Sequence, residues 1–182
     1  MLVEMKVAAI AEDEIFKTPI VILKALNRKD CLPIWVGPFE GQAIEYGIKE
    51  NKLLRPLPYD TILKILQLLN VKLEKIVINN LLNNTFYAII VLNKDGSILE
   101  IDSRPSDAIA IAVRWNSPIF VSEDVIKKAI SIDIDEAAME NSEDINPGIN
   151  LDQANKDMNG DKKRWKEWLM KLKPEDFGKY EM

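Results

Sequence analysis

The chain has 182 residues, of which 24 are Lys or Arg, 29 are Asp or Glu, one is Cys and none is His. The absence of His excludes Ser-His-Asp and Cys-His nucleophilic sites and His-ligated zinc, and a net charge of -5 gives no general attraction for nucleic acid. Any catalysis must therefore use carboxylates, Lys, Tyr, Arg or a metal held by oxygen, and any phosphate binding needs a local patch.

The single cysteine, Cys31, cannot form an internal disulfide, which is typical of a reduced, cytoplasmic protein. We expect Cys31 to be a small core residue rather than a reactive thiol. The N-terminal sequence MLVEMKVAAIAEDE carries charges within its apolar stretch, and no apolar run approaches the roughly 18 residues of a membrane span. We therefore predict a protein that is neither exported nor inserted into a membrane.

Three strands are predicted first, from segments that alternate or run apolar over strand-like lengths: MLVEMKVAAI, TPIVILKAL and CLPIWV. Polar breaks at residues 12–17 and 27–30 separate them. Two helices follow, from Pro38 to about Glu50 and from Pro58 to about Leu69, and the second has a broad apolar face. We expect both helices to pack on the sheet.

Three further strands, VKLEKIVINN, NNTFYAIIVLN and SILEIDS, alternate again and predict an antiparallel meander, with turns at Asn83-Asn84 and Asp95-Gly96. The segment PSDAIAIAVRWN is apolar almost all round and predicts a buried helix. A short strand, PIFVS, and a last helix starting near Ser122 complete the series. Strands in runs and helices in runs predict an α+β fold, with a mixed, largely antiparallel sheet and helices packed on it.

The charges divide the chain into three parts. Residues 1–130 carry 16 acidic and 16 basic side chains, residues 131–161 carry 9 and 1, and residues 162–182 carry 4 and 7. We therefore predict a main domain over 1–130, an acidic linker over 131–161, and an amphipathic C-terminal helix and tail over 162–182.

The predicted C-terminal helix has an apolar stripe of Trp165, Trp168, Leu169 and Leu172. Its basic, aromatic face is compatible with contact to nucleic acid or a partner. Two Trp on one stripe more often indicate burial, so we favour docking onto the main domain or across a dimer. The stripe and the apolar content of the chain also predict a homodimer.

Three of the predicted helices open in the same way, with Pro at the first helical position and a carboxylate two residues later. A first-turn carboxylate gains roughly 0.3 to 1 kcal/mol from the helix dipole, so capping alone explains this pattern. The carboxylates are Glu40, Asp60 and Asp107.

Arg55 and Arg104 are harder to explain by local structure, because each lies just before a helix, at the positive end of its dipole. Each needs a nearby anion, and Asp102 is the obvious partner for Arg104. The segment Asp102 to Asp107 also holds two hydroxyls at a strand-to-helix junction, where sites often lie. Such a cluster is able to hold Mg²⁺ or Mn²⁺ while Arg binds a phosphate. The alternative is a satisfied internal salt bridge that locks the turn.

At these residues the sequence resembles the bifunctional nuclease domain family. The resemblance covers roughly residues 3–128, in the blocks PIVILKAL, LPIWVGPFEGQAI, RPLPYD, NNTFYAII, IDSRPSDAIAIAVR and PIFVSEDV. It implies a compact α+β protein and a metal-assisted nuclease, with Mg²⁺ or Mn²⁺ as cofactor, acting on DNA and RNA in a cytoplasmic setting. The segment IDSRPSDAIA is the most specific of these matches.

One position departs from the family. Members commonly read R-P-L-T-H-D where this chain reads RPLPYD, so Tyr59 stands in place of His. Either the imidazole is a general base that this chain lacks, or it is not catalytic in the family. The other polar motif positions are present: Glu40, Arg55, Asp60, Asp102, Arg104, Ser106 and Asp107.

Two functions are consistent with these residues. The first is a metal-assisted phosphodiesterase in which Asp102 and Asp107 bind the metal, and Asp60 and Glu40 act as further ligands or base. In this hypothesis Arg55, Arg104 and Ser106 bind phosphate, and all these side chains must converge on one cleft. The second is a non-catalytic homodimeric binding module whose Asp/Arg motif is a structural network of salt bridges.

Overall fold

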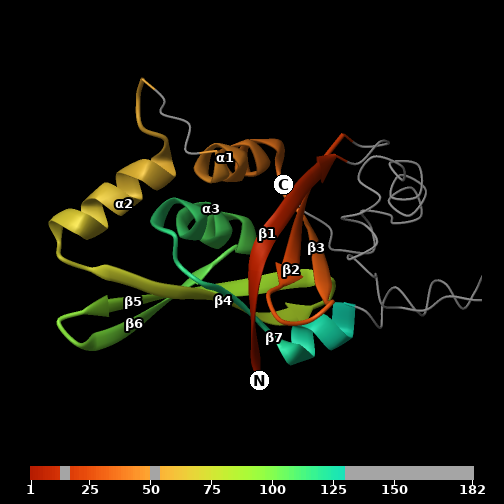
Figure 1. The fold of residues 1–182 in the computed structure, drawn as a ribbon. Helices are drawn as coiled ribbons and strands as arrows, with labels where there is room; N and C mark the ends of the chain where they lie inside the picture. Colours follow the sequence, from red (N-terminus) through yellow and green to blue (C-terminus); the bar gives the residue numbers. More distant parts are fainter. Residues whose placement is uncertain (13–16, 50–53, 130–182) are drawn as a thin grey trace, which may run out of the picture.

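The computed structural model describes residues 1–12, 17–49 and 54–129, and these residues fold into a sheet with helices packed on it (Figure 1). The α+β class predicted from the sequence is confirmed, and a further helix over residues 123–129 follows the last strand, as expected. The elements are β1 (Leu2–Glu12), β2 (Pro19–Ala25), β3 (Cys31–Trp35), α1 (Pro38–Ile48), α2 (Pro58–Leu68), β4 (Lys72–Leu82), β5 (Thr85–Lys94), β6 (Ser97–Ser103), α3 (Pro105–Trp115) and β7 (Ile119–Ser122).

The strands form one seven-stranded sheet in the order β3-β2-β1-β7-β4-β5-β6. All neighbouring pairs are antiparallel except β4 and β7, which are parallel. The predicted meander is β4-β5-β6, and its turns use left-handed backbone at Asn83 and Asn84 and at Asp95 and Gly96. Asn, Asp and Gly adopt positive φ readily, so these short turns match the twist of the strands they join.

Helix α3 crosses one face of the sheet. It starts from β6 at the edge and returns the chain to β7 in the interior, because the parallel pairing of β7 with β4 requires a crossover. The helix packs against β4, β5, α1 and α2 (Figure 1). Most of its residues are buried, as predicted, and Ile109 is completely enclosed.

The face of the sheet beneath α3 is defined by the strand register. Ile76 pairs with Ile90, and Ile78 pairs with Ala88. These four residues and Ile109 of α3 belong to the same buried core. Because successive side chains in a strand point to opposite faces, the neighbours of these residues in β4 and β5 point away from α3.

The two helices before β4 differ in how they pack. Helix α1 contacts β2 and α3, whereas α2 packs against α3 and buries only Leu63. Leu63 nevertheless belongs to the same buried core as the strand residues, so α2 joins the layer on the sheet chiefly through its contact with α3. Its broad apolar stripe is only partly covered, since Ile65, Leu68 and Leu69 are 49%, 71% and 55% exposed.

The predicted acidic linker over 131–161 and the predicted C-terminal helix over 162–182 lie outside the described residues. Within the part of the chain that the structure describes, no helix is long and apolar enough to cross a membrane.

Cys31 packs against the core as expected, and burial raises the pKa of its thiol from 9.0 to about 11, against a smaller lowering by Lys24 and with a still smaller contribution from Asp30. At pH 8 the thiolate population, and hence alkylation by iodoacetamide, should be roughly 100-fold lower in the folded protein than in urea. The unfolded chain loses the thiol proton of Cys31 at a lower pH than the folded protein does. The free energy of unfolding should therefore decrease as the pH rises from about 9 to 11. Equal alkylation rates in both states would contradict this assignment.

Candidate functional site

The first turns of α1, α2 and α3 carry the three predicted carboxylates, but only one of these is a cap. In α2 the backbone N–H of Leu57 donates to Oδ2 of Asp60 at 2.7 Å. Glu40 in α1 and Asp107 in α3 make no such cap bond. The capping hydrogen bond is therefore confined to Asp60, whereas Glu40 and Asp107 keep the first-turn position that favours a carboxylate and make their hydrogen bonds elsewhere.

Glu40 and Asp107 both bind Arg104, which precedes α3. Nε of Arg104 donates to Oδ2 of Asp107 at 2.7 Å, and Nη2 donates to Oε1 of Glu40 at 2.7 Å and to Oδ1 of Asp107 at 3.1 Å. Tyr59 of α2 donates its hydroxyl to Oδ1 of Asp107 at 2.7 Å. We call these four residues the Arg104 cluster; they come from the starts of three helices that are distant in sequence.

The cluster leaves its guanidinium accessible. The Arg104 side chain is 56% exposed, whereas Glu40 and Asp107 are 18% and 27% exposed. The hydrogen bond to Asp107, together with Glu40, raises the pKa of Arg104 and keeps it charged, against a smaller effect of burial. Two carboxylates and one guanidinium give the cluster a formal charge of -1.

Asp102, the partner that the sequence suggested for Arg104, is not part of this cluster. It pairs with Ile89 across β5 and β6, whereas its neighbour Ile101 pairs with Ile90. Since Ile90 faces α3, Asp102 lies on the opposite face of the sheet. The expectation of an Asp102–Arg104 pair is therefore wrong, because strand alternation turns this carboxylate away from the helix.

Tyr59 stands where the family commonly has His, and it links two parts of the site. Burial and the hydrogen bond to Asp107 raise the pKa of Tyr59, so the phenol stays protonated as a donor. The guanidinium carbon of Arg114 lies 5.4 Å from the centre of the Tyr59 ring, within cation–π distance. Tyr59 therefore contacts the Arg104 cluster through its hydroxyl and Arg114 through its ring.

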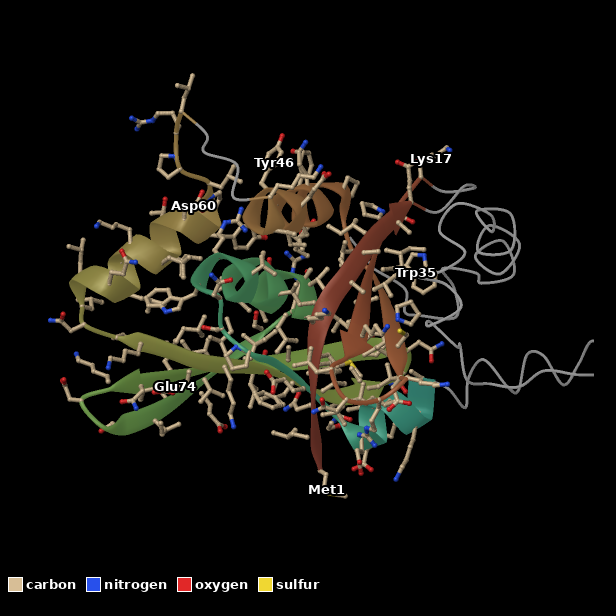
Figure 2. The ribbon with its side chains drawn as sticks, viewed as in Figure 1. Met1, Lys17, Trp35, Tyr46, Asp60 and Glu74 are labelled. Atoms are coloured by element: carbon tan, nitrogen blue, oxygen red, sulfur yellow. The ribbon has the colours of Figure 1, made fainter. Side chains whose placement is uncertain are left out.

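Arg114, near the end of α3, is a site residue that the sequence analysis missed. Its Nε donates to Oδ1 of Asp60 at 2.7 Å, and its side chain is only 7% exposed. Asp60 lies at the start of α2, as Figure 2 shows. The sequence did contain a signal for Arg114, because it is a charged residue in a helix that is otherwise apolar almost all round. A charged side chain on such a buried helix requires an oppositely charged partner.

The remaining predicted residues lie elsewhere. Arg55 is exposed in the loop before α2 and forms no ion pair with another residue of the described ranges. Ser106 is in the first turn of α3 but is only 6% exposed, so it is part of the packed interior. The structure thus brings Glu40, Arg104 and Asp107 together, with Asp60 nearby through Arg114, and leaves Arg55, Asp102 and Ser106 outside.

The described residues do not form a preformed metal site. No group of three or more Cys, Asp or Glu among them is placed to hold a metal ion. Glu40 and Asp107 converge, but Arg104 already occupies the position between them, and Asp102 faces away. The predicted ligand pair of Asp102 and Asp107 therefore does not fit Mg²⁺ or Mn²⁺ in this arrangement.

Fold and site define an α+β protein that presents a guanidinium held by two carboxylates at the starts of its helices. Residues 21–134 match the family described as the bifunctional nuclease domain. The chain belongs to this family, as the sequence motifs predicted.

Two relatives in Mycobacterium tuberculosis, from strains CDC 1551 and H37Rv, share 30% identity with the chain over 174 residues. In both, the match covers 96% of this chain and 97% of the relative, and both are described as uncharacterized proteins. The likeness therefore extends over almost the full length of each protein.

Replacing Tyr59 with Phe should remove the hydrogen bond to Asp107 and lower the free energy of unfolding by about 1 to 2 kcal/mol, measured in urea at pH 7. Because the folded protein raises this pKa, the stabilisation is complete below the unfolded value of about 10 and declines as the pH rises above it. Tyr87→Phe, at a residue 42% exposed, is the matched control and should change little. Equal stability of the two variants would exclude an energetic role for the bond.

Proposed function

We propose that the chain hydrolyses phosphodiester bonds in DNA, RNA or both. The family description supports nuclease chemistry, and one structural observation carries the proposal for this chain. Arg104 is exposed at the start of α3 with two carboxylates bound to it, one on α1 and one on α3. Hydrolysis at phosphorus uses a carboxylate as general base and a cation to compensate the charge on the phosphate oxygens, and both groups lie together here.

Glu40 is the better placed of the two carboxylates to act as general base. Its Oε1 accepts a hydrogen bond from Arg104, whereas its Oε2 accepts none from the described residues. Both oxygens of Asp107 are engaged, by Arg104 and by Tyr59. We therefore assign proton abstraction from the attacking water to Glu40, charge compensation at the phosphate oxygens to Arg104, and positioning of Arg104 to Asp107 and Tyr59.

The cofactor predicted from the sequence, Mg²⁺ or Mn²⁺, remains a proposal. A divalent ion would supply charge neutralisation at the phosphate and an activated water. No step above is assigned to it, because the described carboxylates do not form a site for it. Comparing Mg²⁺, Mn²⁺ and EDTA in the cleavage assay tests this requirement directly.

Glu40→Gln should lower the cleavage rate of single-stranded and duplex DNA and RNA by about 10² to 10⁴-fold, because the amide accepts no proton. The matched control is Glu45→Gln on the same helix, whose carboxylate pairs with Lys49 outside the cluster. Both variants must be purified identically to exclude contaminating nucleases. Equal rates in wild type and Glu40→Gln would reject Glu40 as the base, and loss of activity in Asp102→Asn would move the site to the other face of the sheet.

Gly37→Ala tests the position of Glu40 without removing its carboxylate. Gly37 has extended backbone that Ala adopts easily, at φ -65° and ψ 157°, but an added Cβ would collide with Oε2 of Glu40. The Glu40 side chain should rotate away, with a loss of roughly 1 kcal/mol or less in stability and at least a tenfold loss of activity. Unchanged activity with a displaced Glu40 would show that its position is not important.

The alternative function is a non-catalytic binding module, and the same cluster offers one observation in its favour. Arg104 makes three hydrogen bonds to the two carboxylates, which is what a structural network requires. In that case purified wild-type protein should cleave no nucleic acid, and Asp107→Ala should cost several kcal/mol of stability. A folded, inactive Asp107→Ala variant of an active wild type would reject this alternative.

We further propose that the protein is a homodimer. Helix α2 and the edge strand β6 support this, because both leave apolar side chains uncovered: in β6, Ile98, Leu99 and Ile101 are 56%, 46% and 47% exposed. A second copy of the chain would cover these apolar side chains and pair with the free edge of β6. Sedimentation should therefore show a species of twice 20.8 kDa, and Ile101→Glu should shift it toward the monomer. A 20.8 kDa species at all concentrations would contradict the proposal.

A further inference from the structure

A polyanionic substrate needs a site of net positive charge, and the Arg104 cluster, whose one cation is assigned to the phosphate that is cut, does not provide one. Its formal charge is -1, and both carboxylates already use the guanidinium. The chain as a whole is also acidic, at -5. Attraction of a phosphate backbone must therefore come from another part of the surface.

A pocket of about 330 Å³ lies next to the cluster, between α1, α2 and the end of α3. Tyr46 lines it from α1, Asp60 and Lys64 from α2, and Arg114 and Asn116 from α3 and its cap. Figure 2 labels Tyr46 on α1 and Asp60 on α2. The charged groups of the pocket are two cations and one carboxylate, so its formal charge is +1.

Arg114 is held rigidly in this pocket. Besides Nε bound to Asp60, its Nη1 donates to the carbonyl of Ala110 at 2.8 Å. Gly47 allows α1 to approach α3 closely. A Cβ added at this position would lie 2.6 Å from a methyl group of Val113 and 3.0 Å from Nη1 of Arg114, both on α3. Nη2 makes no hydrogen bond to any of the described residues. One donor of a buried, charged guanidinium is therefore available in a pocket that opens to solvent.

An anion suits this arrangement, and in the proposed function that anion is a phosphate of the substrate. A guanidinium that is 7% exposed interacts with an anion more strongly than a solvated one does, because water screens it less. Its orientation is fixed by Asp60 and Ala110, so little entropy is lost on binding. Lys64 adds a second cation on a flexible stem at the rim of the pocket, where it is exposed.

We propose that this pocket binds a backbone phosphate of the nucleic-acid substrate through Nη2 of Arg114 and Nζ of Lys64. The inference rests on the proposed function and identifies the pocket as the phosphate anchor, the place where the backbone of the substrate is held. Tyr59 joins the two places, because its ring contacts Arg114 and its hydroxyl binds Asp107. A strand anchored in the pocket therefore lies beside the Arg104 cluster, with Glu40 and Arg104 reserved for the bond that is cut.

Binding is best measured in the Glu40→Gln background, so that cleavage does not interfere. The probes are fluorescein-labelled single-stranded DNA and RNA oligonucleotides, titrated by anisotropy between 50 and 200 mM NaCl. Lys64→Gln should weaken binding about 5- to 10-fold at 50 mM NaCl and reduce the slope of log K against log salt by about 0.7, the value for one lost contact to a single strand. The matched control is Lys6→Gln, at an exposed lysine on β1 with the same change of charge.

Each result has a distinct meaning. A loss confined to Lys64→Gln supports the pocket as the phosphate anchor. Equal effects of Lys64→Gln and Lys6→Gln, or no effect of either, overturn the inference while nucleic-acid binding and the proposed function stand. If the Glu40→Gln protein and the wild type bind neither probe at 50 mM NaCl, the inference fails; the proposed function fails as well only if the wild type also cleaves no single-stranded or duplex substrate.

Discussion

The parallel pairing of β4 with β7 is the constraint on which the rest of the structure depends. Because β6 ends at the edge of the sheet and β7 lies in its interior, the chain must cross the face of the sheet, and α3 is that crossing. The helix is buried by the sheet on one side and by α1 and α2 on the other. Its fixed position places Arg104 and Asp107 at one end and Arg114 toward the other, so both parts of the candidate site are set by one rigid element.

The helix dipole of α3 acts in opposite directions on the arginines at its two ends. At its start, the helix dipole disfavours Arg104, and two carboxylates compensate for this at the cost of a local charge of -1. Toward its end, the dipole favours Arg114, which needs only Asp60 as a partner and keeps one donor available. The proposed reaction site, which is rich in carboxylates, is thus separate from the proposed cationic anchor, and this suits a substrate whose own charge is negative. In the proposed function, this separation allows an acidic chain to bind a polyanionic substrate.

Much of the fold could be predicted because local rules agree with the tertiary structure. The turns at Asn83 and at Gly96, the prolines that begin the helices, and the buried character of α3 all follow from short-range preferences. The packing of α2 could not be predicted in this way. Its apolar stripe shows that a partner exists but not which one, and in the described chain much of the stripe, including Leu68, remains uncovered.

The sequence by itself determined the element order, the absence of imidazole chemistry, the family and the strand-to-helix position of the IDSRPSD segment. Tertiary structure alone decided which of its polar residues act together. Asp102 and Asp107 are five positions apart, yet they lie on opposite sides of the sheet. Asp107 belongs to α3, which covers one face, whereas the alternation of side chains along β6 turns Asp102 to the other face. Glu40 and Arg104 are distant in sequence, yet they form an ion pair, because the crossover brings the starts of α1 and α3 together. Spacing along the chain indicates which residues have chemistry to offer, and packing decides which of them meet.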